Sequence, residues 1–122
     1  MNSEDMKRRT KVFGLRVIEL VDDLPPGKVA GTIGYQLLRS ATSVGANYRA
    51  ACRGRSKPDF ISIIGIAIEE ADESLYWMEL LVDSGIVPGE KTVDLMREGN
   101  ELVAILTASS KTARARLANR KG

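Results

Sequence analysis

The chain has 122 residues, which is enough for one domain with a single hydrophobic core. Its 43% apolar residues, 28% charged residues and net charge of +2 are ordinary for a globular protein, and 5% aromatic residues are too few for most β-sandwiches and barrels. The chain contains no histidine and one cysteine, Cys52, which excludes histidine-based catalytic triads, intramolecular disulfides and zinc sites built from several cysteines.

Three short breaks rich in glycine and proline divide the chain into four segments of helical length. Within each segment, apolar residues recur at alternating spacings of three and four, which is the period of an amphipathic α-helix. Helices are therefore predicted over residues 4–24, 28–54, 57–85 and 89–118. Short connections make consecutive helices antiparallel neighbours. The sequence thus predicts an all-α fold, an antiparallel up-and-down four-helix bundle that forms one domain over residues 1–122.

Charge is strongly segregated along the sequence despite the small net value. Residues 24–58 carry six basic and no acidic residues, whereas residues 59–83 carry seven acidic and no basic residues. On the second predicted helix, Arg39, Arg49 and Arg53 fall opposite the apolar stripe when each residue turns the helix by about 100°. Two interpretations stay open for this ridge: a solvated face partly neutralised by the acidic third helix, or a surface that binds phosphates.

The phosphate-binding interpretation defines a set of candidate nucleic-acid-binding residues. They are Arg39, Arg49, Arg53, Arg55 and Lys57 on and after the second helix, with Lys111, Arg114 and Arg116 near the C-terminus. No aromatic residue is interleaved with the ridge arginines, so stacking on bases is not indicated. We therefore expect contacts to the nucleic-acid backbone with weak sequence specificity.

A narrow polar row flanks the apolar stripe of the second helix. Its members, Gln36, Ser40, Ser43 and Asn47, recur at spacings of four, three and four residues. Small hydrogen-bonding side chains permit a close approach of two helices and fix their register. We interpret the row as a helix-packing device, and a ligand-binding row is the alternative.

The third predicted helix is apolar over a wider arc than the roughly 100° that one core needs. Ile66 and Trp77 extend the stripe, and Tyr76 and Leu80 fall among the acidic residues. Self-association would bury this surface, so these four residues form the predicted oligomer interface. The alternative is a central third helix that is covered by the first and fourth helices.

Groups that could support metal or redox chemistry lack their usual partners. Glu70 and Glu73 have helical spacing, but by phase they point outward, and no histidine is present to complete a carboxylate-bridged site. Cys52 has no neighbouring base or resolving thiol. No stretch of 18 apolar residues is present, and the first residues lack the apolar core of a secretion signal. We expect a cytoplasmic, non-enzymatic protein without metal, cofactor or membrane contact.

Residues 36–85, with the sequence QLLRSATSVGANYRAACRGRSKPDFISIIGIAIEEADESLYWMELLVDSG, resemble the bacterial family of 23S ribosomal RNA intervening-sequence proteins. The similarity is carried by Gln36, Leu37, Arg39, Ser40, Ser43, Asn47, Arg55, Ser56, Phe60, Ile66, Ala67 and Glu73. The resemblance implies four-helix bundles that assemble as homopentameric rings. It also implies a relationship to the accessory protein of diversity-generating retroelements, which engages nucleic acid and a reverse transcriptase.

Together, the residues and the resemblance lead to one functional expectation with one alternative. The expected protein is a non-catalytic homo-oligomer, a pentamer by resemblance, that associates with RNA or DNA through the basic ridge of the second helix. The alternative is an oligomeric scaffold or adaptor whose basic surface binds a protein partner.

Overall fold

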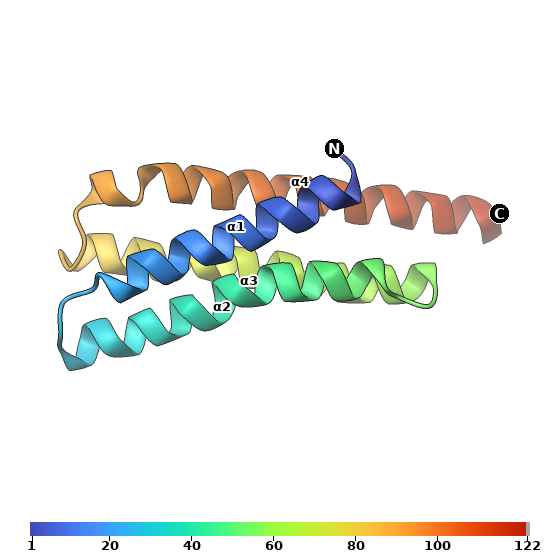
Figure 1. Ribbon diagram of the computed structural model, residues 1–122. Coiled ribbons are helices and arrows are strands. Elements are labelled where there is room, and N and C mark those ends of the chain that lie inside the picture. The colour runs from blue at the N-terminus through green and yellow to red at the C-terminus, as the bar shows by residue number, and fades with distance from the viewer. Residues whose placement is uncertain (122) are drawn as a thin grey trace.

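The computed structural model describes residues 1–121 and contains four α-helices and one short 3-10 helix. These elements are α1 (Ser3–Asp22), α2 (Lys28–Cys52), α3 (Lys57–Asp83), η1 (Gly89–Lys91) and α4 (Val93–Lys121). No strand occurs within residues 1–121. The four long helices run alternately in opposite directions (Figure 1). The prediction of an all-α fold with four helices is therefore confirmed.

Polar caps and glycines define where the helices begin. Asn2 Oδ1 accepts a hydrogen bond from the backbone N–H of Asp5 at 2.8 Å, and Ser56 Oγ accepts one from Asp59 at 3.2 Å. Both caps satisfy N–H groups that have no partner inside the helix. Before α2, Gly27 adopts a φ of 141°, which side-chain-bearing residues rarely reach. A glycine at this position allows the tight reversal between α1 and α2.

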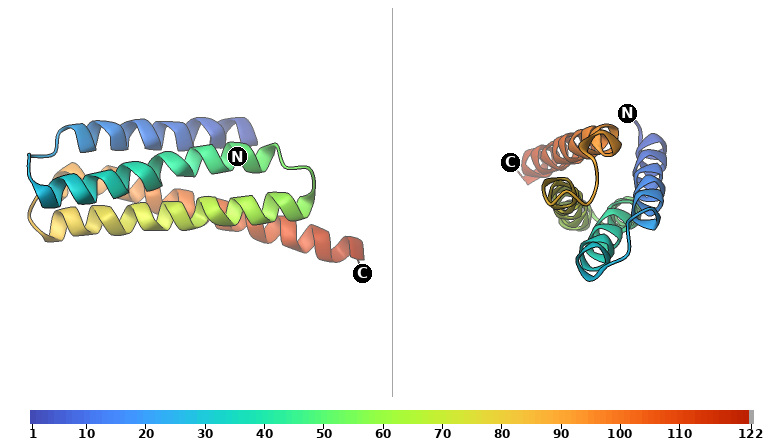
Figure 2. Two further views of the ribbon diagram at one scale, coloured as in Figure 1. Left: turned by 90° about the horizontal axis from the view of Figure 1, so that it is seen from below. Right: turned by 90° about the vertical axis from the view of Figure 1, so that its left-hand side faces the viewer.

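The helices surround one core in the cyclic order α1, α2, α3, α4, as the end-on view in Figure 2 shows. Among neighbouring helices, the α2–α3 pair packs most extensively and the α1–α4 pair touches least. The largest fully buried side chains come from all four helices: Phe13, Leu37, Ile64, Met78, Leu81, Leu102 and Leu106. Burial of these side chains is the main favourable contribution to folding.

The helix ends differ from the predicted boundaries. The first three helices each end two residues earlier than predicted. The fourth starts at Val93 instead of residue 89, because Lys91 N–H bonds to the Pro88 carbonyl and Thr92 N–H to the Gly89 carbonyl, a 3-10 pattern. At its other end α4 continues to Lys121 instead of stopping at residue 118.

The polar row of α2 has one member at a helix–helix contact. Ser40 is fully buried, and Ser74 Oγ on α3 lies 3.0 Å from Ser40 Oγ. The other three members hydrogen-bond within α2. Ser43 Oγ donates to the Arg39 carbonyl, Asn47 donates to the Ser43 carbonyl, and Gln36 accepts from Arg39. The row therefore contributes to α2–α3 packing through Ser40.

Candidate nucleic-acid interface

The antiparallel arrangement gathers basic residues at one end of the bundle, which we call the basic end. There α1 and α3 begin, and α2 and α4 end (Figure 1). The segments at this end, residues 1–11, 46–60 and 107–121, contain 13 lysines and arginines and three acidic residues. The segments at the opposite end, 18–32 and 76–94, contain seven acidic and two basic residues. The bundle is thus electrically polarised along its axis.

The last two turns of α4 project beyond the core and carry exposed cations. Ala113 is the last buried residue of this helix, and Arg114 and Arg116 after it are exposed. Because they are two positions apart, they point in directions about 200° apart around the helix. Figure 2 shows this end of α4 extending away from the other helices. The projecting helix therefore presents positive charge on more than one side.

The turn between α2 and α3 adds further cations to the basic end. Arg53 and Arg55 are exposed, and Lys57 is half-buried at the first position of α3. Asp59, an acidic residue in the first turn of α3, accepts a hydrogen bond from the backbone N–H of Arg55 at 3.3 Å. Its carboxylate is thereby engaged with the backbone and offsets only part of the local positive charge.

Arg39 lies apart from this end and is neutralised by α3. Its guanidinium contacts Glu73 Oε1 at 2.9 Å and Glu70 Oε2 at 3.4 Å. The hydrogen bond to Glu73 raises the pKa of Arg39, and the charge of Glu70 adds to this effect. The prediction that Glu70 and Glu73 point away from the bundle is wrong. The Glu70 side chain is only 16% exposed, because it turns toward α2.

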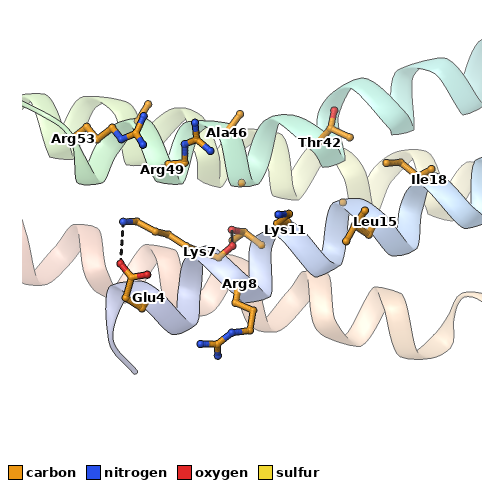
Figure 3. Close-up of a pocket in the computed structure, with 14 residues that line it drawn as sticks. Glu4, Lys7, Arg8, Lys11, Leu15, Ile18, Thr42, Ala46, Arg49 and Arg53 are labelled. Atoms are coloured by element: carbon orange, nitrogen blue, oxygen red, sulfur yellow. Dashed lines mark hydrogen bonds and ion pairs between the residues drawn. The ribbon is translucent and has the colours of Figure 1, made fainter.

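Arg49 and Arg53 lie on the other flank of α2, where they line a groove beside α1. This α1–α2 groove has a volume of about 1050 Å³. Lys7, Arg8, Lys11, Arg49 and Arg53 line its basic part, and Leu15 and Ile18 line its apolar part (Figure 3). Lys7 pairs with Glu4 at 3.2 Å inside the groove. The ridge inferred from helical phase is therefore divided between two flanks of α2.

Small residues create the α1–α2 groove. A Cβ atom placed on Gly45 would lie 3.3 Å from Thr10 Oγ1, and one placed on Gly14 would lie 3.8 Å from the Ala41 carbonyl oxygen. The two backbones therefore approach closely along the floor, and no bulky side chain fills the space above it. Sequence reasoning missed this groove, although the absence of side chains at Gly14 and Gly45 was its visible signal.

The predicted interface residues of α3 differ in exposure. Ile66 is 44% and Tyr76 52% exposed, while Trp77 and Leu80 are half-buried. The indole N–H of Trp77 donates to Glu73 Oε1 at 3.3 Å, the same oxygen that Arg39 contacts. Trp77 is therefore hydrogen-bonded to the carboxylate that pairs α3 with α2. Ile66 and Tyr76 are the large apolar side chains of this set that solvent reaches most.

Two further observations concern metal and membrane chemistry. Among residues 1–121, no three histidine, cysteine, aspartate or glutamate side chains come together in a group that could hold a metal ion. In the same part of the chain, no helix combines the length and the apolar character needed to cross a membrane. Cys52 is a half-buried free thiol.

The structure defines an all-α helical-bundle protein with one basic end. The chain belongs to the family of 23S rRNA-intervening sequence proteins, whose family model matches residues 4–108, so the predicted family is confirmed. A solved structure from Bacteroides thetaiotaomicron, described as a protein of unknown function from the S23 ribosomal protein family, is 32% identical. The similarity covers 91% of this chain and 99% of that one, with a TM-score of 0.84. None of the curated proteins matches this chain.

Proposed function

We propose that this protein is a non-catalytic, cytoplasmic homo-oligomer, a pentamer by family resemblance, that binds the backbone of RNA or DNA with its basic end. The observation that carries the proposal is the collection of exposed cations from separate segments at one end of the bundle. Arg53 and Arg55 come from the α2–α3 turn, and Lys111, Arg114 and Arg116 come from the end of α4.

The chemistry of the basic end favours phosphate contacts over recognition of bases. Arginine presents a planar fork of donors that matches phosphate oxygens. The segment from Lys111 to Lys121 contains five basic residues and no aromatic residue on which a base could stack. Contacts of this kind position a protein on nucleic acid without reading its sequence. We therefore expect similar affinity for unrelated sequences of equal length and strandedness.

A pair of charge-matched variants tests this site. Arg114→Gln with Arg116→Gln removes two charges from the basic end. Arg39→Gln with Arg97→Gln removes two charges from ion pairs with Glu70, Glu73 and Asp94 elsewhere on the bundle. Fluorescence anisotropy with a labelled RNA duplex at about 50 mM salt should show at least tenfold weaker binding for the first variant and less than threefold for the second. Equal losses would contradict a site at the basic end.

The alternative function, an oligomeric scaffold for a protein partner, is favoured by one observation. The α1–α2 groove combines exposed Leu15 and Ile18 with several cations, as expected for a surface that receives an acidic amphipathic helix. If the native chain binds neither RNA nor DNA at about 50 mM salt, the nucleic-acid proposal is wrong and the scaffold function replaces it.

A further inference from the structure

We propose that the α1–α2 groove receives α3 of a second copy of this chain, an inference that rests on the proposed homo-oligomer and names the two surfaces that form it. The acceptor is a groove with a basic part and an apolar part. The ligand is the outer stripe of α3, defined as Ile66, Glu69, Asp72, Tyr76 and Glu79. The contact is heterologous, because each copy offers a groove and a stripe that are different surfaces.

The acceptor surface carries charge that its own chain leaves without a carboxylate. Lys11, Arg49 and Arg53 form no ion pair with any of the described residues, and all three are exposed. Leu15, which is 50% exposed, and Ile18 continue the same face of α1 beyond the cations. A surface with this division fits a helix that is acidic along part of its length and apolar at one end.

The outer stripe of α3 has that composition. Its members follow one another at spacings of three, three, four and three residues, so they share one face of the helix. All five are exposed, and Glu69, Asp72 and Glu79 form no ion pair with side chains of residues 1–120. Ile66 and Tyr76 supply the apolar and aromatic area, and a tyrosine ring can also receive an arginine cation on its face.

The two surfaces agree in length and in the order of their groups. The stripe from Ile66 to Glu79 and the α1 wall from Glu4 to Ile18 both extend about 20 Å at 1.5 Å per residue. In the proposed register α3 is antiparallel to α1 and Ile66 lies beside Ile18. Measured along the helix axes from this pair, Asp72 is about 9 Å away and Lys11 is about 10 Å away. In this register Asp72 reaches the basic part of the groove at Lys11, whereas Glu69, about 4.5 Å beyond Ile66, lies at the level of Leu15. The opposite direction would place Glu69 and Asp72 beyond the apolar part.

Charge reversal with rescue tests the contact in the absence of nucleic acid. Light scattering of the native chain should give a mass several times 13.3 kDa. Lys11→Glu with Arg49→Glu should reduce this mass, and so should Asp72→Lys with Glu79→Lys, while circular dichroism keeps the helical signal. Mixing the two variants should restore a complex. A native oligomer that both variants leave intact would overturn the docking contact but not the oligomer, and a native monomer would overturn both.

A disulfide trap tests the register. In a Cys52→Ser background, chains with Ile18→Cys are mixed with chains with Ile66→Cys and oxidised. The expected product is a covalent pair of the two different chains, formed at least tenfold faster than with a Glu79→Cys partner. Equal rates with the two partners, or faster trapping of Glu79→Cys, would overturn the antiparallel register.

Discussion

Arg9 on α1 and Glu98 on α4 form a two-bonded ion pair across the seam where the bundle is least tightly closed. Arg9 Nε lies 2.9 Å from Glu98 Oε2, and Arg9 Nη2 lies 2.6 Å from Oε1. The side chains are only 26% and 20% exposed. The hydrogen bond to Glu98 raises the pKa of Arg9 despite its partial burial. Because α1 and α4 touch least among neighbouring helices, this pair is the main polar link between the first and last helix.

The first prediction concerns this link. Glu98→Gln should lower the free energy of unfolding by about 1.5–3 kcal/mol, because a paired, partly buried arginine loses its charged acceptor. Urea unfolding followed by circular dichroism measures the change. Arg97, next to Glu98 in sequence, forms an exposed ion pair with Asp94. Arg97→Gln breaks that pair and is the matched control, which should lower the free energy of unfolding by less than about 0.5 kcal/mol. Equal effects of the two substitutions would show that the Arg9–Glu98 ion pair stabilises the fold no more than an exposed surface pair.

The second prediction concerns the close packing of α4 on α1 and α3 at Gly99. A Cβ atom there would lie 2.9 Å from Leu75 Cδ2 and 3.4 Å from Phe13 Cε1. Gly99→Ala should therefore destabilise the protein by about 1–3 kcal/mol, although alanine favours helices over glycine. The control is Gly31→Ala on α2, where the added Cβ meets nothing within 4 Å and should stabilise by about 0.5–1 kcal/mol. A gain in thermal midpoint for both variants would contradict tight packing at Gly99.

The third prediction concerns alkaline pH. Burial raises the pKa of Tyr48 above its ordinary value of about 10, and the nearby Cys52 thiol adds to the shift. Just above pH 10, Tyr48 therefore stays protonated in the native state but loses its proton in the unfolded state. The stability contributed by this group is complete below about pH 10, the ordinary tyrosine pKa, and declines as the pH rises further.

Tyr48→Phe isolates this effect, because the variant has no proton to keep. Urea midpoints at pH 8 and pH 11 should fall less in the variant than in the native chain. Equal losses in the two proteins would contradict a buried, protonated Tyr48.

The helices could be predicted because each one buries a single apolar stripe, and this stripe repeats with the period of the helix. The start of α4 could not, since the 3-10 turn depends on carbonyls of Pro88 and Gly89 that capture the N–H groups of Lys91 and Thr92. Hydrogen bonds of this kind compete with a helix start at residue 89 without changing the apolar period. The extension of α4 to Lys121 could not be predicted either, because residues beyond the core bury no apolar side chains and so show no helical periodicity.

The candidate site was predictable in part. Helical phase places Arg39, Arg49 and Arg53 on the surface, and all three are exposed. Helical phase contains no information on which helix packs against each flank of α2, so it predicts a single ridge. In the structure Arg39 pairs with Glu73 on one flank, and Arg49 and Arg53 line a groove on the other. The basic end depends on the antiparallel course of four helices, which brings together segments about 50 residues apart in sequence.

The salt dependence of binding shows whether the basic end contacts nucleic-acid phosphates. Each phosphate that a cation neutralises releases counterions, so the log–log slope against salt should be about −0.9 per contact for duplex DNA. We expect a clearly negative slope for the native chain. The slope should become shallower by about 2 or more when Arg55, Lys57, Arg114 and Arg116 are replaced by Gln, with the fold retained. An unchanged slope in that variant would contradict phosphate binding at the basic end.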